Sequence, residues 1–142
     1  MRKSMSLRFF LLIITTLTLN TAYPANTNRI TDPVILGAGE KLFQTNCAVC
    51  HGIKAQGNGE DWNKPNTDGK SPPPPLNGTA HAWHHPVGAL MKTIRNGTMP
   101  IGGTMPAWKN TLSNEEIFSI IVWFSSLWPD EIYNEWMRRN KQ

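Results

Sequence analysis

The sequence predicts an all-α protein of three to five helices joined by long loops. Helix start and stop signals occur near both ends and in the middle of the chain, whereas residues 52–79 show neither the two-residue period of strands nor the 3.6-residue period of helices. With 142 residues, 17% of them charged, and 11 prolines, the chain suits one small domain. A multi-span membrane protein is excluded, because no apolar run approaches the ~20 residues of a spanning helix.

The N-terminal segment has the pattern of a secretory signal peptide. Three basic residues precede an apolar run from Phe9 to Leu19, and small and polar residues follow it. We expect cleavage after Ala22, with Ala25 as the other candidate, so that residues 1–22 are removed and residues 23–142 form a single domain in the periplasm. The alternative is that the apolar run remains uncleaved as a membrane anchor.

Removal of this segment also changes the charge of the protein. The full chain has a formal net charge of +4, but loss of Arg2, Lys3 and Arg8 reduces its 14 basic residues to 11, against 10 acidic ones. A nearly neutral mature chain has no general attraction for polyanions. We therefore expect no nucleic-acid partner.

The strongest motif is Cys47-Ala48-Val49-Cys50-His51. Two thiols three residues apart share a face of a helical turn and can form thioethers with two vinyl groups of one haem, which places His51 under the iron. A thioredoxin-like pair would need a βαβ pattern around it, and a zinc site would need a second cysteine pair. The motif predicts one haem c, attached covalently through Cys47 and Cys50.

Local signals define the helices on either side of this motif. Asp32 followed by Pro33 starts a first helix that runs into Cys47. Pro86 opens a second, with Val87, Leu90, Met91 and Ile94 on its apolar face and Asn96-Gly97 at its end.

The last third of the chain carries the clearest helical pattern. Ser113 and Glu116 form a capping box, and apolar residues follow at helical spacing from Ile117 to Phe124, before Pro129 ends the helix. A final short helix is expected from Pro129 to about Arg139, because acidic residues stand in its first turn and basic residues in its last.

The iron needs a sixth ligand, for which Met105 and Met99 are the candidates, each followed by proline. Met99 stands only two residues beyond the helix end at Gly97, which leaves little chain to cross a haem face at ~3.5 Å per residue. Met105 has eight residues for the same span, and two glycines within it permit tight turns. Met105 is therefore the predicted ligand, although either methionine could instead fill a gap in the core.

The remaining histidines, His81, His84 and His85, cluster around Trp83. His81 and His85 would share a face if the segment were helical, but Pro86 disfavours a regular helix there. We expect surface or haem-propionate contacts for them, with a second metal site or alternative iron ligation as the other interpretation. No metal beyond the haem iron is expected.

In this order, the motifs resemble those of class I c-type cytochromes of the small, single-haem, secreted kind. The resemblance covers about Gly39 to Trp128 and is carried by Gly39 and Phe43, Cys47 to Gly52, Pro74-Pro75-Leu76-Asn77-Gly78, Ile94-Arg95-Asn96-Gly97, Met105-Pro106-Ala107-Trp108 and Trp123. It implies a class I cytochrome c fold around one covalently bound haem, in which the first and last long helices cross with Gly39 against Trp123. It also implies that a carbonyl of the Pro74–Leu76 turn accepts a hydrogen bond from the His51 ring.

The function implied is one-electron transfer in a periplasmic respiratory or redox chain, with iron held by His51 and Met105 and with redox proteins as donor and acceptor. We expect no enzyme activity, since no general acid or base is evident beside the iron; a haem enzyme would need an open sixth site. Another alternative is an electron-entry subunit of a periplasmic dehydrogenase, with an apolar surface such as Trp128 and Trp136 as its interface.

Partners of a freely diffusing carrier would dock at the haem edge nearest the attachment motif. We expect a small apolar contact there, formed by Ala48, Val49 and the loop near Met105. The basic residues expected at its rim are Lys54, Lys92, Arg95 and Lys109.

Overall fold

The computed structural model describes residues 29–59 and 61–141, within which all regular secondary structure is helical. The elements are α1 (Pro33–Asn46), α2 (Ala48–His51), the 3₁₀ turn η1 (Ala82–His84), α3 (Val87–Asn96), the 3₁₀ turn η2 (Met99–Ile101), α4 (Asn114–Ser126) and α5 (Asp130–Asn140). The predicted all-α class is confirmed for this part of the chain. The expected signal peptide, residues 1–22, lies outside the described residues.

Helix α1 begins where its local chemistry predicts. The Asp32 carboxylate accepts hydrogen bonds from the backbone amides of Val34 (2.8 Å) and Ile35 (3.4 Å), which satisfies donors that have no partner within the helix. The helix ends at Cys47, and α2 forms a separate single turn after it. The attachment motif is therefore a turn of its own rather than the last turn of the first helix.

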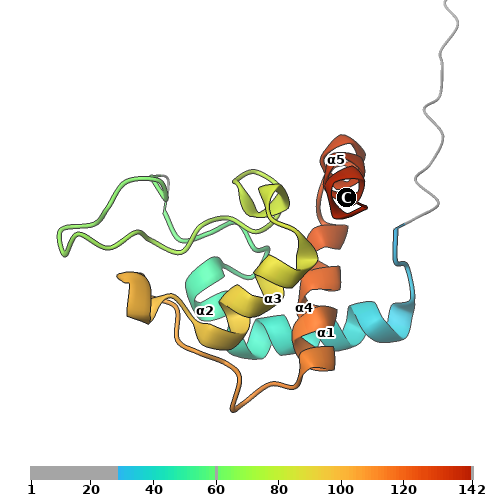
Figure 1. Cartoon of the computed structure of the whole chain (residues 1–142), viewed down its shortest axis with the longest axis horizontal. Helices are drawn as coiled ribbons and strands as arrows, with labels where there is room; N and C mark the ends of the chain where they lie inside the picture. Colours follow the sequence, from blue (N-terminus) through green and yellow to red (C-terminus); the bar gives the residue numbers. More distant parts are fainter. Residues whose placement is uncertain (1–28, 60, 142) are drawn as a thin grey trace, which may run out of the picture.

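Helices α1 and α4 cross in close contact, as Figure 1 shows. A Cβ atom at Gly39 would lie 2.0 Å from the carbonyl oxygen of Ser119 and 2.9 Å from Cβ of Trp123, so only glycine permits this approach. The rings of Phe43 and Trp123 pack next to the crossing, with centroids 4.5 Å apart. The implied contact between Gly39 and Trp123 is confirmed.

Among the described elements, helix α4 supplies the most buried residues. Both hydrogen bonds of its capping box are present, from the Glu116 amide to the Ser113 hydroxyl (3.2 Å) and from the Ser113 amide to the Glu116 carboxylate (2.8 Å). Ile117, Ile121 and Phe124 are almost completely buried.

The extra C-terminal helix α5 belongs to the same core. Trp128 and Trp136 are only 3% and 6% exposed, and their rings meet edge to face with centroids 5.2 Å apart. The sequence-based expectation that these two tryptophans could form an exposed interface is therefore wrong. The rings turn inward because each indole N–H reaches a backbone carbonyl, that of Leu76 for Trp128 and that of His85 for Trp136, both at 2.7 Å.

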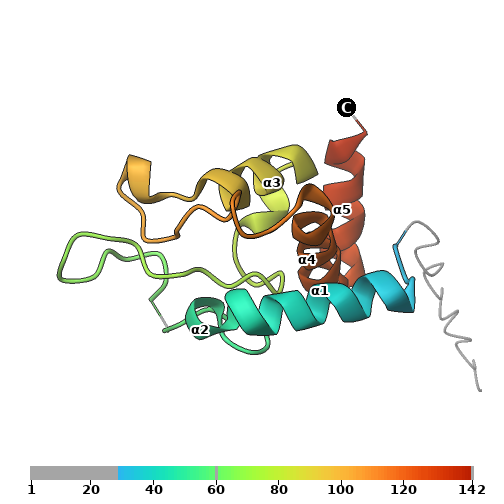
Figure 2. The ribbon, with the colours of Figure 1, turned by 90° about the horizontal axis from the view of Figure 1, so that it is seen from below.

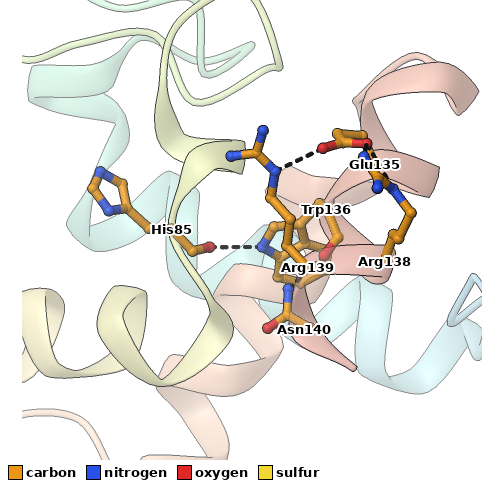
Figure 3. A network of polar contacts seen from close by, with 6 residues as sticks. All are labelled: His85, Glu135, Trp136, Arg138, Arg139 and Asn140. Atoms are coloured by element: carbon orange, nitrogen blue, oxygen red, sulfur yellow. Dashed lines mark hydrogen bonds and ion pairs between the residues drawn. The ribbon is translucent and has the colours of Figure 1, made fainter. Parts of the chain in front are cut away.

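Helix α5 also holds the start of α3. Figure 3 shows Trp136 directed at the His85 carbonyl, with Asn140 one turn later on the same helix. The Asn140 side-chain oxygen accepts a 2.8 Å hydrogen bond from the amide of Val87, the first residue of α3. A side chain 53 residues away thus caps a helix whose own flanking residue, Pro86, provides no side-chain hydrogen bond.

Arg29, the first described residue, joins the N-terminal segment to the end of α4 and the start of α5, through contacts that we call the Arg29 clasp. Its guanidinium donates to the carbonyls of Ser125 (3.0 Å), Ser126 (3.2 Å) and Trp128 (3.1 Å) and pairs with Asp130 at 2.8 Å. It also lies over the Tyr133 ring, 4.0 Å from the centroid. These contacts satisfy carbonyls at the end of α4 and fix the residue that enters α1 against α5.

Among the described residues, no helix combines the length and the hydrophobicity needed to cross a lipid bilayer.

Candidate functional site

The turn α2 brings the two cysteines and the adjacent histidine together. The amides of Cys50 (3.1 Å) and His51 (2.9 Å) both donate to the Cys47 carbonyl, which closes the turn. Both thiols are free; Cys47 is half-buried and Cys50 is exposed. Burial, with a smaller contribution from the neighbouring Cys50, raises the pKa of Cys47 to about 11, so that its thiol is protonated at neutral pH.

The imidazole of His51 is held by one backbone carbonyl. Its Nδ1 lies 2.9 Å from the oxygen of Pro74, and because a carbonyl only accepts, Nδ1 must donate. Nε2 then carries the lone pair that a metal ligand needs. Burial lowers the pKa of His51, opposed by the Pro74 hydrogen bond, and the ring is therefore neutral at pH 7.

The turn that carries Pro74 is held by hydrogen bonds to the backbone of Ala55. The amides of Leu76 (2.7 Å) and Asn77 (3.1 Å) donate to the carbonyl of Ala55, a fully buried residue with a φ of 53°. A Cβ at Gly57 would lie 2.8 Å from the Pro75 ring. Sequence patterns gave no sign of the role of Ala55, because positive φ is uncommon for alanine.

The structure separates the two candidate methionines. Met99 lies on η2 with 62% of its surface exposed, whereas Met105 is half-buried. The amide of Met105 donates to the Thr98 hydroxyl (3.1 Å), and the Met105 carbonyl accepts from the Thr98 amide (2.9 Å). Met105 is therefore held in a closed backbone turn, and Met99 projects toward solvent.

Exposed apolar side chains gather at the end of the molecule that carries α2 and η2. Figures 1 and 2 both place these two segments on the side away from α5. Four large side chains are prominent there, at 62% to 84% exposure: Val49, Ile53, Met99 and Ile101. Single exposed apolar residues are ordinary on a protein surface, and these four are candidate contact points for another protein on two segments at the same end of the domain. We call these four residues the apolar rim.

The basic residues expected near this surface differ in their surroundings. Lys54, Lys92 and Lys109 are exposed. Arg95 is half-buried, and its guanidinium donates to the side chain of Asn114 at the start of α4. Three of the four are free to meet a partner, while Arg95 takes part in joining α3 to α4.

The histidine cluster lies elsewhere, on η1 and its flanks. His81, His84 and His85 are exposed; the His81 ring stacks on Trp62 (centroids 5.2 Å apart), and the His85 ring meets it edge-on (5.6 Å). Within residues 29–59 and 61–141, no group of three or more His, Cys, Asp or Glu side chains could hold a metal ion. This arrangement agrees with the surface interpretation of these histidines.

The residues of α2 and its surroundings fit a covalently bound haem. Two free thiols one turn apart and a neutral imidazole with an available Nε2 are the required donor set. Apolar side chains that pack against the core while remaining partly accessible are available to cover the faces of a porphyrin: Leu76, Leu90, Met91, Ile94 and Trp108.

Comparison with known proteins matches this chain to c-type cytochrome subunits of cbb3-type oxidases. A family model described as cytochrome C oxidase, cbb3-type, subunit III matches residues 36–124, from within α1 to within α4. The matched residues end before α5.

Several curated relatives carry related names. The chain is 34% identical over 91 residues to the cbb3-type cytochrome c oxidase subunit FixP of Azorhizobium caulinodans (63% of this chain, 26% of the relative). It is 38% identical over 90 residues to FixP of a Bradyrhizobium species (63% and 27%), and 31% identical over 102 residues to the subunit CcoP of Azospirillum brasilense (70% and 30%). The chain thus spans between a quarter and a third of the length of these relatives. No solved structure matches it.

Proposed function

This chain belongs to the cbb3-type cytochrome c oxidase subunit III family, and from that premise we propose that it is a periplasmic one-electron carrier with a single haem c. Membership makes it a small c-type cytochrome domain and a haem electron-transfer protein. The proposal adds covalent attachment through Cys47 and Cys50, iron ligation by His51 and Met105, and export directed by residues 1–22.

The observation that carries the proposal is the 2.9 Å contact between His51 Nδ1 and the Pro74 oxygen. It orients the imidazole and directs Nε2 away from the carbonyl, at the end of the turn that carries both thiols. When bound, haem c cycles between the ferric and ferrous states and so accepts and releases one electron. The chain fixes the imidazole, the thiols and the Met105 backbone, so that little needs to rearrange between the two states.

The residues that would hold the iron favour a carrier over a haem enzyme. An enzyme that binds a small molecule at iron needs an open or easily vacated sixth position. Met105 is half-buried in a turn closed by two hydrogen bonds with Thr98, which favours a permanently filled position.

Spectroscopy of the purified, mature protein tests this function. We expect covalent haem in a ratio of one per chain, low-spin iron in both oxidation states, and little carbon monoxide binding to the reduced protein at neutral pH. High-spin iron with rapid and complete carbon monoxide binding would instead support an enzyme or a gas sensor. The N-terminal sequence of the mature protein tests cleavage after Ala22 against cleavage after Ala25 and retention as an anchor.

A fixed subunit of a larger redox complex is the second candidate. The apolar rim favours it, because four exposed apolar side chains suit a lasting interface better than a brief encounter. The relatives named above are themselves oxidase subunits, and a periplasmic dehydrogenase is another complex of this kind. The two candidates differ in their expected response to ionic strength.

A further inference from the structure

Thr98 makes an unusual number of contacts with the segment that follows it. Its amide donates to the Met105 carbonyl (2.9 Å), and its hydroxyl accepts from the Met105 amide (3.1 Å). Its own carbonyl accepts from the amides of Ile101 (3.0 Å) and Gly103 (2.9 Å). Thr98 thus bonds both to residues within the loop 98–105 and to Met105 at the end of the loop.

Two glycines permit the close packing of this loop, Gly97 immediately before it and Gly103 within it. A Cβ at Gly97 would lie 2.6 Å from the Met105 oxygen, and one at Gly103 would lie 2.2 Å from the Thr98 hydroxyl oxygen. Beyond Met105, the Trp108 amide donates to the carbonyl of Ile94 in α3 at 3.2 Å. The backbone is therefore bonded to the end of α3 or to the residues just after it at two points, at Met105 and at Trp108.

The sequence offers a natural comparison between Thr98 and Thr104, because both stand in the same four-residue motif. Gly-Thr-Met-Pro occurs twice, at residues 97–100 and 103–106. The first copy contributes the half-buried Thr98 and the exposed Met99; the second contributes the exposed Thr104 and the half-buried Met105. The threonine of one copy thus holds the methionine of the other, which explains how two identical motifs adopt different roles.

We propose that Thr98 is the positioning residue for Met105. It would hold the thioether at the iron through two hydrogen bonds, one from the Thr98 amide to the Met105 carbonyl and one from the Met105 amide to the Thr98 hydroxyl. This inference rests on the proposed ligation by Met105. Without the hydroxyl, the partly buried Met105 amide loses its partner, and the loop opens more readily. Met105 would then leave the iron more often, and an external ligand would take its place.

The test is a titration of the ferric holoprotein with imidazole, followed through the weak sulfur-to-iron charge-transfer band. Thr98→Val keeps the size of the side chain and removes the hydroxyl; Thr98→Ser keeps the hydroxyl. Thr104→Val is the matched control, one residue from Met105 in the second motif. We expect Thr98→Val to bind imidazole roughly fivefold more tightly, and the other two to differ from wild type by less than about twofold.

The outcomes separate this proposal from the one on which it rests. A wild-type protein without the band, or a band that survives Met105→His, overturns ligation by Met105. A band that is present, with equal imidazole affinities for Thr98→Val and Thr104→Val, overturns the role of Thr98 alone. Hydrogen exchange of the Met105 amide in the unaltered protein gives an independent measurement: protection supports the proposal, and exchange at the unprotected rate contradicts it.

Discussion

Trp128 and Leu76, 52 residues apart in sequence, are joined by a 2.7 Å hydrogen bond from the indole Nε1 to the backbone carbonyl. Leu76 lies two residues beyond Pro74, whose carbonyl holds the His51 ring. The connection between α4 and α5 is thereby linked, through one short turn, to the orientation of the proposed iron ligand.

Trp128→Phe is expected to lower the free energy of unfolding by about 1–3 kcal/mol, because the partly buried carbonyl of Leu76 loses its partner. Trp136→Phe is the matched control, since it removes a hydrogen bond of the same length to His85. Urea unfolding should show similar losses for both variants. Only Trp128→Phe should shift the redox potential, and equal potentials for the two variants would argue against the link to His51.

Met105→His should retain covalent haem, lower the redox potential and abolish the sulfur-to-iron band, because a nitrogen ligand replaces the thioether. Met99→His changes an exposed side chain and should leave both properties unaltered. Absorption spectra and potentiometry of the two variants decide the assignment, which would be reversed if Met99→His removed the band and Met105→His preserved it.

Two glycines of α1, Gly37 and Gly39, differ sharply in their surroundings. A Cβ at Gly39 would collide with Ser119, whereas one at Gly37 meets nothing within 4 Å. Gly39→Ala should therefore destabilise the protein by about 1–3 kcal/mol or more, through separation of α1 from α4. Gly37→Ala should stabilise it by up to about 1 kcal/mol, because alanine is the better helix former. Thermal unfolding measures both, and comparable effects would contradict the close crossing.

Acidification should weaken the contact between the 52–79 loop and η1. Although His81 is exposed overall, partial desolvation of its ring lowers its pKa, and the neighbouring His85 and His84 lower it further. The unfolded chain therefore binds the proton more readily, and the His81 contribution to stability is lost as the pH falls below about 6.5. Urea midpoints at about pH 7 and pH 5.5 should differ less for His81→Gln than for wild type. An unchanged difference would show that His81 titrates as it does in the unfolded chain.

Charge at the proposed docking surface should affect association more than redox potential. For a diffusing carrier, electron transfer to its acceptor should slow as ionic strength rises, and Lys109→Glu should slow association at low salt. Arg95→Gln is less informative, because Arg95 already bonds to Asn114. Rates that ignore both salt and the charge reversal would favour the fixed subunit, held through the apolar rim.

Local chemistry made much of this fold predictable. The Asp32 cap, the Ser113 capping box and the end of α3 at Gly97 all depend on residues close in sequence, and all are found in the structure. The resemblance to class I c-type cytochromes, rather than local chemistry, implies the contact of His51 with a carbonyl of the Pro74–Leu76 turn, and in the structure this carbonyl is that of Pro74.

The features that the sequence did not reveal are long-range. Arg29 bonds to residues 96 to 101 positions away, and Asn140 caps a helix 53 positions away. No pattern among the neighbouring residues in the sequence predicts either contact. The inward direction of Trp128 and Trp136 was also missed, because a short helix after a proline offers too few residues to define its buried face.

The Arg29 clasp determines how the domain would be presented on a tether. Figure 2 shows the described chain entering at one end of α1, with α2 at the other. Fourteen residues of helix separate these points by about 21 Å. A membrane anchor or neighbouring domain joined ahead of Arg29 would therefore hold the domain at the end opposite α2, and would leave α2 and the apolar rim facing away from the point of attachment.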